Sequence, residues 1–131
     1  MNRQQRIDLM TAPPKILLLD DNHELLSTYR ELLAAHLPSK PEIKVASSAT
    51  RALSMLETEP FSLLIEDLHL PHMDGLQVLS IARRKYPQMR IVVALDPVDF
   101  RNGIDGIARV CKEALREDPF CGTVFVFRNR R

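Results

Sequence analysis

The sequence predicts an α/β fold built on a parallel β-sheet with helices on both faces. Short apolar runs alternate strictly with longer segments in which apolar residues recur every three or four positions. Runs of this length, bounded by polar residues, are typical of strands buried on both faces. Strict alternation favours parallel strands joined by right-handed crossovers. In such a sheet, sites form at the carboxyl ends of the strands, where the strand order reverses.

The first strand is predicted to begin at Lys15, and the first helix follows it. The apolar run that follows ends abruptly in Asp20, Asp21 and Asn22. We expect Asn22 to cap the next helix, whose apolar residues recur at helical spacing. A second strand is predicted at residues 43–46, and a second helix follows it.

The next two strands follow the same pattern. The third, at residues 61–65, again ends in acids, Glu66 and Asp67. A turn at residues 71–75 leads into a third helix, which Pro87 ends. The fourth strand is predicted at residues 91–95.

The size and composition of the chain fit a soluble globular domain. Its 131 residues are 45% hydrophobic and 27% charged, and the net charge of +1 gives no overall field that favours nucleic acid or membrane. No apolar run approaches the roughly 20 residues of a membrane span. Cys111 and Cys121 fit no metal spacing, which predicts reduced thiols in a cytoplasmic protein. Residues 1–14 lack the apolar core of a signal peptide and are expected to be a disordered lead-in.

The two acidic clusters should meet at one edge of the sheet. Asp20, Asp21 and Asp67 follow the first and third strands, and three converging carboxylates repel each other unless a cation intervenes. Hard oxygen ligands with open water positions suit Mg²⁺. A carboxylate beside such a cation can act as a nucleophile toward a phosphoryl group. One acid pair after a strand is usually only a turn and a helix cap, but acids at matching ends of two strands favour the metal site.

Three stretches of the chain carry a family resemblance: KILLLDDN at residues 15–22, SLLIEDLHLPHMDGLQVL at 62–79 and YPQMRIVVAL at 86–95. Residues 15–95 resemble the receiver domain of bacterial response regulators. The resemblance implies a flavodoxin-like, CheY-like fold in which Asp67 accepts phosphate from a sensor histidine kinase or phosphotransfer protein. It also implies Mg²⁺ held by Asp20, Asp21, Asp67 and the backbone carbonyl of His69.

The receiver pattern breaks after the fourth strand. Receivers place a Thr or Ser at its end, whose hydroxyl bonds the phosphoryl oxygen, but Leu95 stands there. They also place a Lys after the fifth strand. Here Arg128 and Asn129 follow the last apolar run, the one late lysine is Lys112, and the planar fork of an Arg does not replace a Lys. We therefore expect a degenerate receiver in which phosphorylation does not drive the usual switch.

The end of the chain carries a second resemblance. Its sequence words are Pro97-Val98-Asp99-Phe100-Arg101, Gly103-Ile104-Asp105-Gly106, Asp118-Pro119-Phe120 and VFVFRNRR. They are similar to the TnpB-type accessory proteins of bacterial insertion sequences, over residues 91–131. Taken as a segment, residues 96–131 would be a truncated member of that family. Arg128, Arg130 and Arg131 could touch nucleic-acid phosphates, although a solvated basic end is the favoured interpretation.

The tail has the element order that a receiver needs to finish its sheet. Residues 91–95 and 124–127 read as strands, and one apolar helical face lies between them: Ile104, Ile107, Ala108, Cys111 and Leu115. We expect this helix and strand to dock as fourth helix and fifth strand. The fifth crossover helix would be missing, so the fold would be incomplete at its C-terminal side, and uncovered apolar surface would favour a homodimer.

Three functions remain open from the sequence. The first is a receiver without an output domain, which accepts phosphate on Asp67. The second is a transposition accessory protein whose partner is DNA or a transposase. The third is a non-functional remnant of a mobile-element insertion, with its junction in or beside the fourth strand. No nucleophile–base pair or glycine-rich phosphate loop indicates an enzyme.

Overall fold

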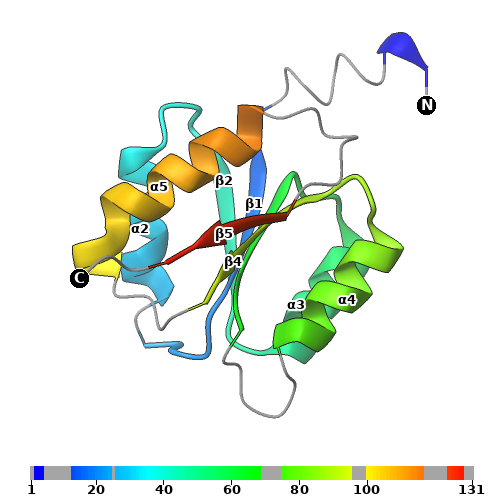
Figure 1. The fold of residues 1–131 in the computed structure, drawn as a ribbon, viewed down its shortest axis with the longest axis horizontal. Coiled ribbons are helices and arrows are strands. Elements are labelled where there is room, and N and C mark those ends of the chain that lie inside the picture. The colour runs from blue at the N-terminus through cyan, green and yellow to red at the C-terminus, as the bar shows by residue number, and fades with distance from the viewer. Residues whose placement is uncertain are drawn as a thin grey trace.

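The computed structural model describes residues 2–4, 13–24, 26–68, 75–95, 100–116 and 124–128. These residues form a parallel five-stranded sheet in the order β2-β1-β3-β4-β5 (Figure 1). The strands are β1 (Lys15–Leu19), β2 (Glu42–Ala46), β3 (Leu63–Asp67), β4 (Arg90–Ala94) and β5 (Val124–Phe127). This confirms the predicted fold class, including a fifth strand supplied by the tail.

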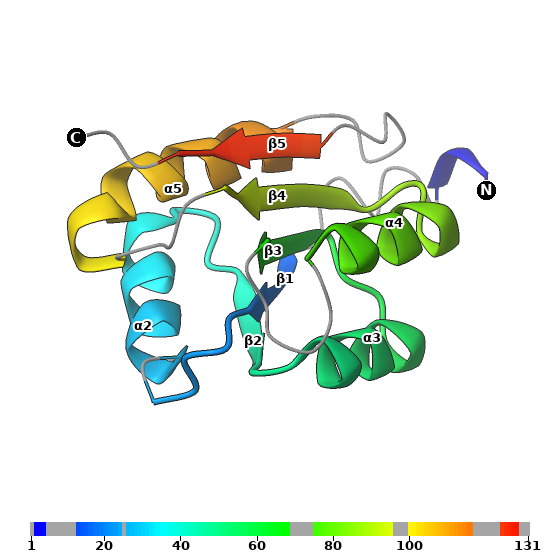
Figure 2. The same ribbon diagram turned by 60° about the horizontal axis from the view of Figure 1, so that its bottom comes forward.

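Helices cover both faces of the sheet, as the buried apolar strands require. One face packs against α2 (Leu26–His36) and α5 (Phe100–Arg116), and the other against α3 (Ala49–Thr58) and α4 (Gly75–Lys85) (Figures 1 and 2). Strand residues alternate between the faces: Ile16 and Leu18 contribute to the first core, Leu17 and Leu19 to the second. All four side chains are at most 1% exposed, so each stabilises the fold by about 1.5–3 kcal/mol relative to an exposed position.

The tail helix α5 is an integral part of the first core. Its apolar face buries Ile107 and Cys111 completely beside α2, and the predicted face is confirmed except that Leu115 is only partly buried. Gly106 lets the helix approach β5 closely, since a Cβ there would lie 3.0 Å from the Phe127 ring. The guanidinium of Arg90, itself buried at the start of β4, donates to the Leu115 carbonyl near the end of α5 (3.2 Å).

The connection through α5 corrects the prediction of uniformly right-handed crossovers. The β3–α4–β4 and β4–α5–β5 units advance in the same direction across the sheet, but α4 and α5 lie on opposite faces. The last crossover therefore has the opposite hand to the others, against a strong general preference. The tail helix does not take the place expected of a fourth helix; it covers the sheet beside α2.

Two local predictions at helix starts had different outcomes. Ser48 caps α3 by accepting a hydrogen bond from the Arg51 N–H (3.1 Å). Asn22 is not the cap of α2, because turn residues separate it from Leu26, where the helix begins. Its N–H donates instead to the Asp20 carboxylate (2.9 Å), which closes a local turn.

None of the helices in the described ranges combines the length and apolarity needed to cross a bilayer.

Candidate functional site

The register of β1 with β3 brings the two acidic clusters to one edge of the sheet. Leu19 pairs with Glu66 in neighbouring parallel strands. Asp20 and Asp67 each follow one of these residues, so their backbones lie level at the carboxyl edge, about 4.8 Å apart by ordinary strand spacing. The predicted convergence of these two positions follows directly from this register.

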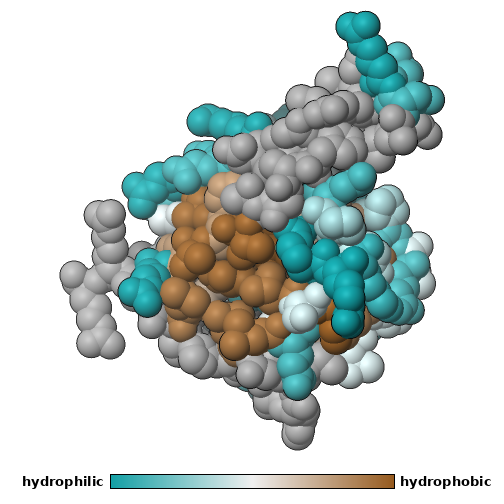
Figure 3. All heavy atoms as spheres, turned by 45° about the vertical axis from the view of Figure 1, so that its right-hand side comes forward, coloured by the Kyte–Doolittle hydropathy of each residue, from teal (hydrophilic) through white to brown (hydrophobic). Residues whose placement is uncertain are grey.

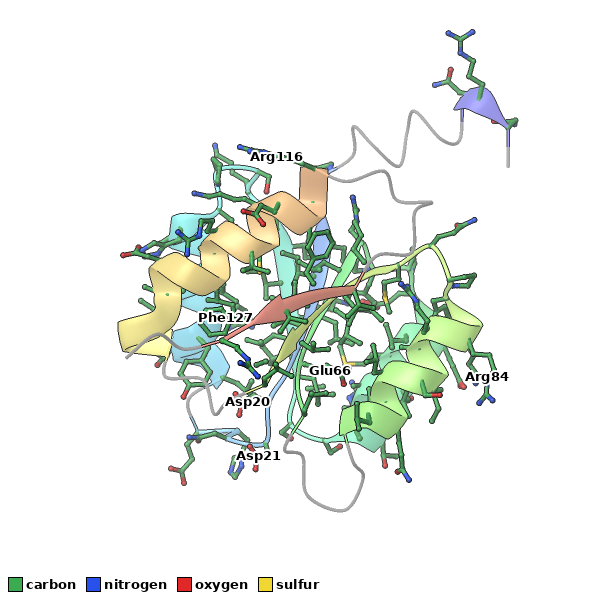
Figure 4. The ribbon with its side chains drawn as sticks, viewed as in Figure 1. Asp20, Asp21, Glu66, Arg84, Arg116 and Phe127 are labelled. Atoms are coloured by element: carbon green, nitrogen blue, oxygen red, sulfur yellow. The ribbon has the colours of Figure 1, made fainter. Side chains whose placement is uncertain are left out.

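Asp20 is held in a defined position at the end of β1. It is 7% exposed, its N–H donates to the Ala46 carbonyl at the end of β2 (3.1 Å), and its Oδ1 accepts from the Asn22 N–H. Asp21 is exposed, and its carbonyl accepts from the His23 N–H (3.0 Å). Figure 4 shows both aspartates at the same side of the molecule as Glu66. One carboxylate is thus buried and fixed, and its neighbour faces solvent.

Glu66 is a residue of this edge that sequence reasoning passed over as part of an acidic strand end. It is completely buried within β3. A buried carboxylate is costly, and such groups concentrate at functional sites. The signal was available: Glu66 directly continues the apolar run Leu63–Ile65, where an acid is out of place.

The rest of the predicted acceptor set falls partly outside the described residues. The Asp67 backbone pairs with Ala94, but its side chain lies outside them, as does His69. The ends of the intervening segment are anchored: the Leu68 N–H donates to the Ala94 carbonyl (3.2 Å), and the Gly75 N–H to the Leu68 carbonyl (3.3 Å). Among described side chains, no three His, Cys, Asp or Glu gather in one place.

The chemistry of the donors at this edge fits Mg²⁺. Asp20, Asp21 and Asp67 supply carboxylate oxygens, and a carbonyl beyond β3 would add another hard oxygen ligand. The buried, hydrogen-bonded Asp20 meets the requirement that a ligand be preoriented, whereas the exposed Asp21 leaves room for coordinated water.

The two departures from the receiver pattern lie at the same edge of the sheet. Leu95 follows Ala94, the register partner of Asp67, and its N–H donates to the Phe127 carbonyl (3.2 Å). Arg128 follows β5 and is exposed, and Lys112 is half-buried within α5. Arg130 and Arg131, the other residues considered for nucleic-acid contact, lie outside the described residues.

A pocket of about 680 Å³ lies at the opposite, amino edge of the sheet, between the ends of α3 and α4. Phe61, Tyr86 and Met89 form apolar parts of its wall. Beside it, Glu59 forms ion pairs with Lys15 (3.0 Å) and Lys44 (2.8 Å). The hydrogen bond from Lys44 and, to a smaller extent, the hydrogen bond from Lys15 hold the pKa of Glu59 below its ordinary value of 4.5. This cluster ties α3 to β1 and β2, far from the acidic edge.

Two family models match the chain and overlap at β4. The first describes the response regulator receiver domain and matches residues 16–96; the second describes the IS66 Orf2 like protein and matches residues 89–131. Response regulator protein FleR of Pseudomonas aeruginosa is 36% identical over 81 residues, which are 60% of this chain and 16% of FleR. Protein y4jC of Sinorhizobium fredii is 51% identical over 43 residues, which are 33% of this chain and 37% of y4jC. The chain thus spans only a minor part of either relative.

Solved structures share the fold. A CheY-like receiver domain protein from Methanospirillum hungatei superposes with a TM-score of 0.60 at 22% identity. The match covers 88% of this chain and 82% of the Methanospirillum chain. One chain in the structure of histidine kinase ThkA in complex with response regulator protein TrrA superposes with a TM-score of 0.62 at 19% identity, and the match covers 89% of this chain and 86% of that one. The coverage of this chain includes much of the tail, so part of the tail belongs to the shared fold.

Proposed function

Because this chain belongs to the response regulator receiver domain family, we propose that it is the phosphate-accepting module of a two-component phosphorelay, with Asp67 as the acceptor. The observation that carries the proposal is the β1–β3 register, which sets Asp20 and Asp67 level at the carboxyl edge of the sheet. Its partner would be a histidine kinase or phosphotransfer protein, and the fold shared with a chain of the ThkA–TrrA structure supports that choice.

In the proposed reaction, an Asp67 carboxylate oxygen attacks the phosphorus of a phosphohistidine. The bond from phosphorus to the histidine nitrogen breaks as the bond to Asp67 forms, and the nitrogen leaves with the electron pair. Asp20, Asp21, Asp67 and the His69 carbonyl would hold Mg²⁺. Bound there, Mg²⁺ would neutralise charge that develops on the phosphoryl oxygens. The Asn22 N–H keeps Asp20 oriented for this role.

We propose further that the receiver is degenerate. Leu95 has no hydroxyl to bond a phosphoryl oxygen, and Arg128 stands after β5 where receivers carry a Lys. Phosphate on Asp67 would then lack the two contacts that normally convert it into a shift of the surrounding loops. The module would hold phosphate or pass it on more readily than it would change conformation in response to phosphorylation.

The test is phosphorylation by acetyl phosphate with Mg²⁺, read by intact-protein mass. The parent should gain one phosphoryl group and Asp67→Asn none, while Asp20→Asn should react at least tenfold more slowly because the metal loses a charged ligand. His69→Ala is the matched control: a carbonyl ligand does not depend on its side chain, so labelling should persist. Equal labelling of the parent and Asp67→Asn would refute the acceptor assignment.

A second candidate, transposition accessory protein, is favoured by the match of residues 89–131 to the IS66 Orf2 like family. It would act on DNA or on a transposase. Fluorescence anisotropy with duplex DNA tests it, since binding through the tail should weaken when the exposed Arg128 is changed to Ala. Affinity that does not depend on Arg128 or on salt would remove this candidate.

A further inference from the structure

The outer edge of β5 presents backbone groups that pair with no other strand in the described part of the chain. β5 lies at one end of the strand order and is the outermost strand in Figure 2. The Phe127 carbonyl accepts from the Leu95 N–H, so the backbone groups of Phe127 point toward β4. Because these directions alternate along a strand, the N–H and C=O of Val126 point away from the sheet.

The two edges of this sheet differ in the features that prevent strand pairing. The β2 edge carries Glu42 and Lys44 and is preceded by Pro41, and Lys44 is engaged with Glu59. Charges and proline are the ordinary protection of an exposed edge. β5 has the sequence VFVF, without a charge or a proline. Of the two edges, as the described residues form them, only the β5 edge lacks this protection.

The side chains of this edge are also unusually apolar for a surface. Val126 on β5 is 52% exposed; the other large exposed hydrophobic residue among those described is Leu76 on α4, at 58%. Figure 3, which brings this side of the molecule forward, shows apolar residues gathered there. The cause is the position of α5: by covering the opposite face, it leaves no helix of the described ranges over Val126 on the α4 side of β5.

We propose that β5 pairs antiparallel with β5 of a second copy, about a two-fold axis at Val126. At that axis, Val126 would exchange both backbone hydrogen bonds with its counterpart, since both of its groups point outward. Because the two-fold axis is perpendicular to the sheet, the same face of both copies lies on the same side. The two exposed Val126 side chains are therefore cross-strand neighbours and cover each other. Arg128 then lies opposite Val124 of the second copy, and no like charges face each other.

The occupant of the edge is a second copy because its chemistry is self-complementary. The contact is isologous and closes on itself, and the protected β2 edges do not extend it into a fibre. A net charge of +1 adds little repulsion between copies. The interface depends on the sheet edge and not on Asp67, so it stands or falls independently of the proposed phosphorylation.

Sedimentation velocity over a dilution series tests the proposal, with the full chain, Val126→Lys and Leu76→Lys. The parent should show a monomer–dimer equilibrium. Val126→Lys should raise the dimer dissociation constant about tenfold or more, because it sets like charges directly opposite each other. Leu76→Lys is the matched control, as an equally exposed apolar residue away from the strand edge, and should leave the constant within about twofold.

Val126→Pro separates backbone pairing from side-chain contact. It removes the outward N–H without removing a bond to β4, so the thermal transition should remain cooperative while the dimer weakens about tenfold. A monomeric parent would overturn the proposal. So would equal weakening by Leu76→Lys, which would indicate docking through an apolar face, or oligomers that grow beyond the dimer.

Discussion

At the scale of single residues, the end of β4 determines how a phosphoryl group on Asp67 would be sensed. Leu95 directly follows the register partner of Asp67, so a hydroxyl at this position would lie beside the acceptor edge. The places of Asp20, Asp67 and Leu95 at the carboxyl edge were predictable because apolar runs and their polar ends are local signals, although β3 extends to Asp67, two residues beyond its predicted end. The burial of Glu66 and the pairing of Glu59 with two lysines depend on distant segments, which local patterns do not encode.

Changing Leu95 to Thr should restore part of the lost coupling. The hydroxyl can donate to a phosphoryl oxygen, and a net gain of about 1 kcal/mol would strengthen binding of a phosphoryl mimic about fivefold. Leu95→Val is the control, because the valine side chain has nearly the same shape as that of threonine but has no hydroxyl. Isothermal titration with beryllium fluoride and Mg²⁺ measures both variants. Equal affinities would show that position 95 does not contact the mimic.

Glu59→Gln should destabilise the protein in a pH-dependent way. The folded protein holds the pKa of this carboxyl below its unfolded value, so its contribution is present above the unfolded pKa and is lost as pH falls through the folded pKa. Urea unfolding should therefore find the variant weaker than the parent at neutral pH, with the two converging in acid.

The matched control for Glu59 is Glu57→Gln. Glu57 pairs with Lys85 at 3.0 Å, but both side chains are more than half exposed, and such surface pairs contribute little. Its loss should have a much smaller effect at any pH. If both variants behaved alike, the two-lysine cluster would have no special role.

At the scale of elements, the tail supplies what the receiver needs but in an unusual place. The apolar stripe of α5 was predictable from helical spacing, but a stripe indicates which side of a helix is buried and not which face of a sheet it covers. Docking beside α2 gives the first core a second helix, with Ile107 and Cys111 fully enclosed. That burial and the close contact of Gly106 with Phe127 accompany a crossover of the rarer hand.

Cys111 reports directly on this docking. Burial raises the pKa of its thiol to about 12, so the reactive thiolate is scarce in the folded protein at pH 8. In a Cys121→Ser background, Ellman's reagent should react with the native protein far more slowly than with the same protein in urea. Equal rates in the two conditions would mean that α5 is not packed on the sheet.

At the scale of the whole molecule, segments that match two different family models form one sheet. The family matches overlap at β4, and β5 pairs with β4 in continuous register. The sequence predicts a missing crossover helix and uncovered apolar surface, and among the described residues Val126 is exposed on the α4 side of a five-stranded sheet. Because the first core joins α2 to α5 across the junction, we expect the chain to unfold as one unit.

The most direct test is thermal unfolding of the parent and Asp67→Ala, with and without Mg²⁺ plus beryllium fluoride. A ligand that binds only the folded state stabilises it by about 2.7 kcal/mol at a hundredfold excess over Kd. We predict one cooperative transition that the ligand shifts upward in the parent and not in Asp67→Ala. A transition without cooperativity, or an equal shift in both proteins, would contradict the account of a folded receiver whose acceptor site is assembled on a composite sheet.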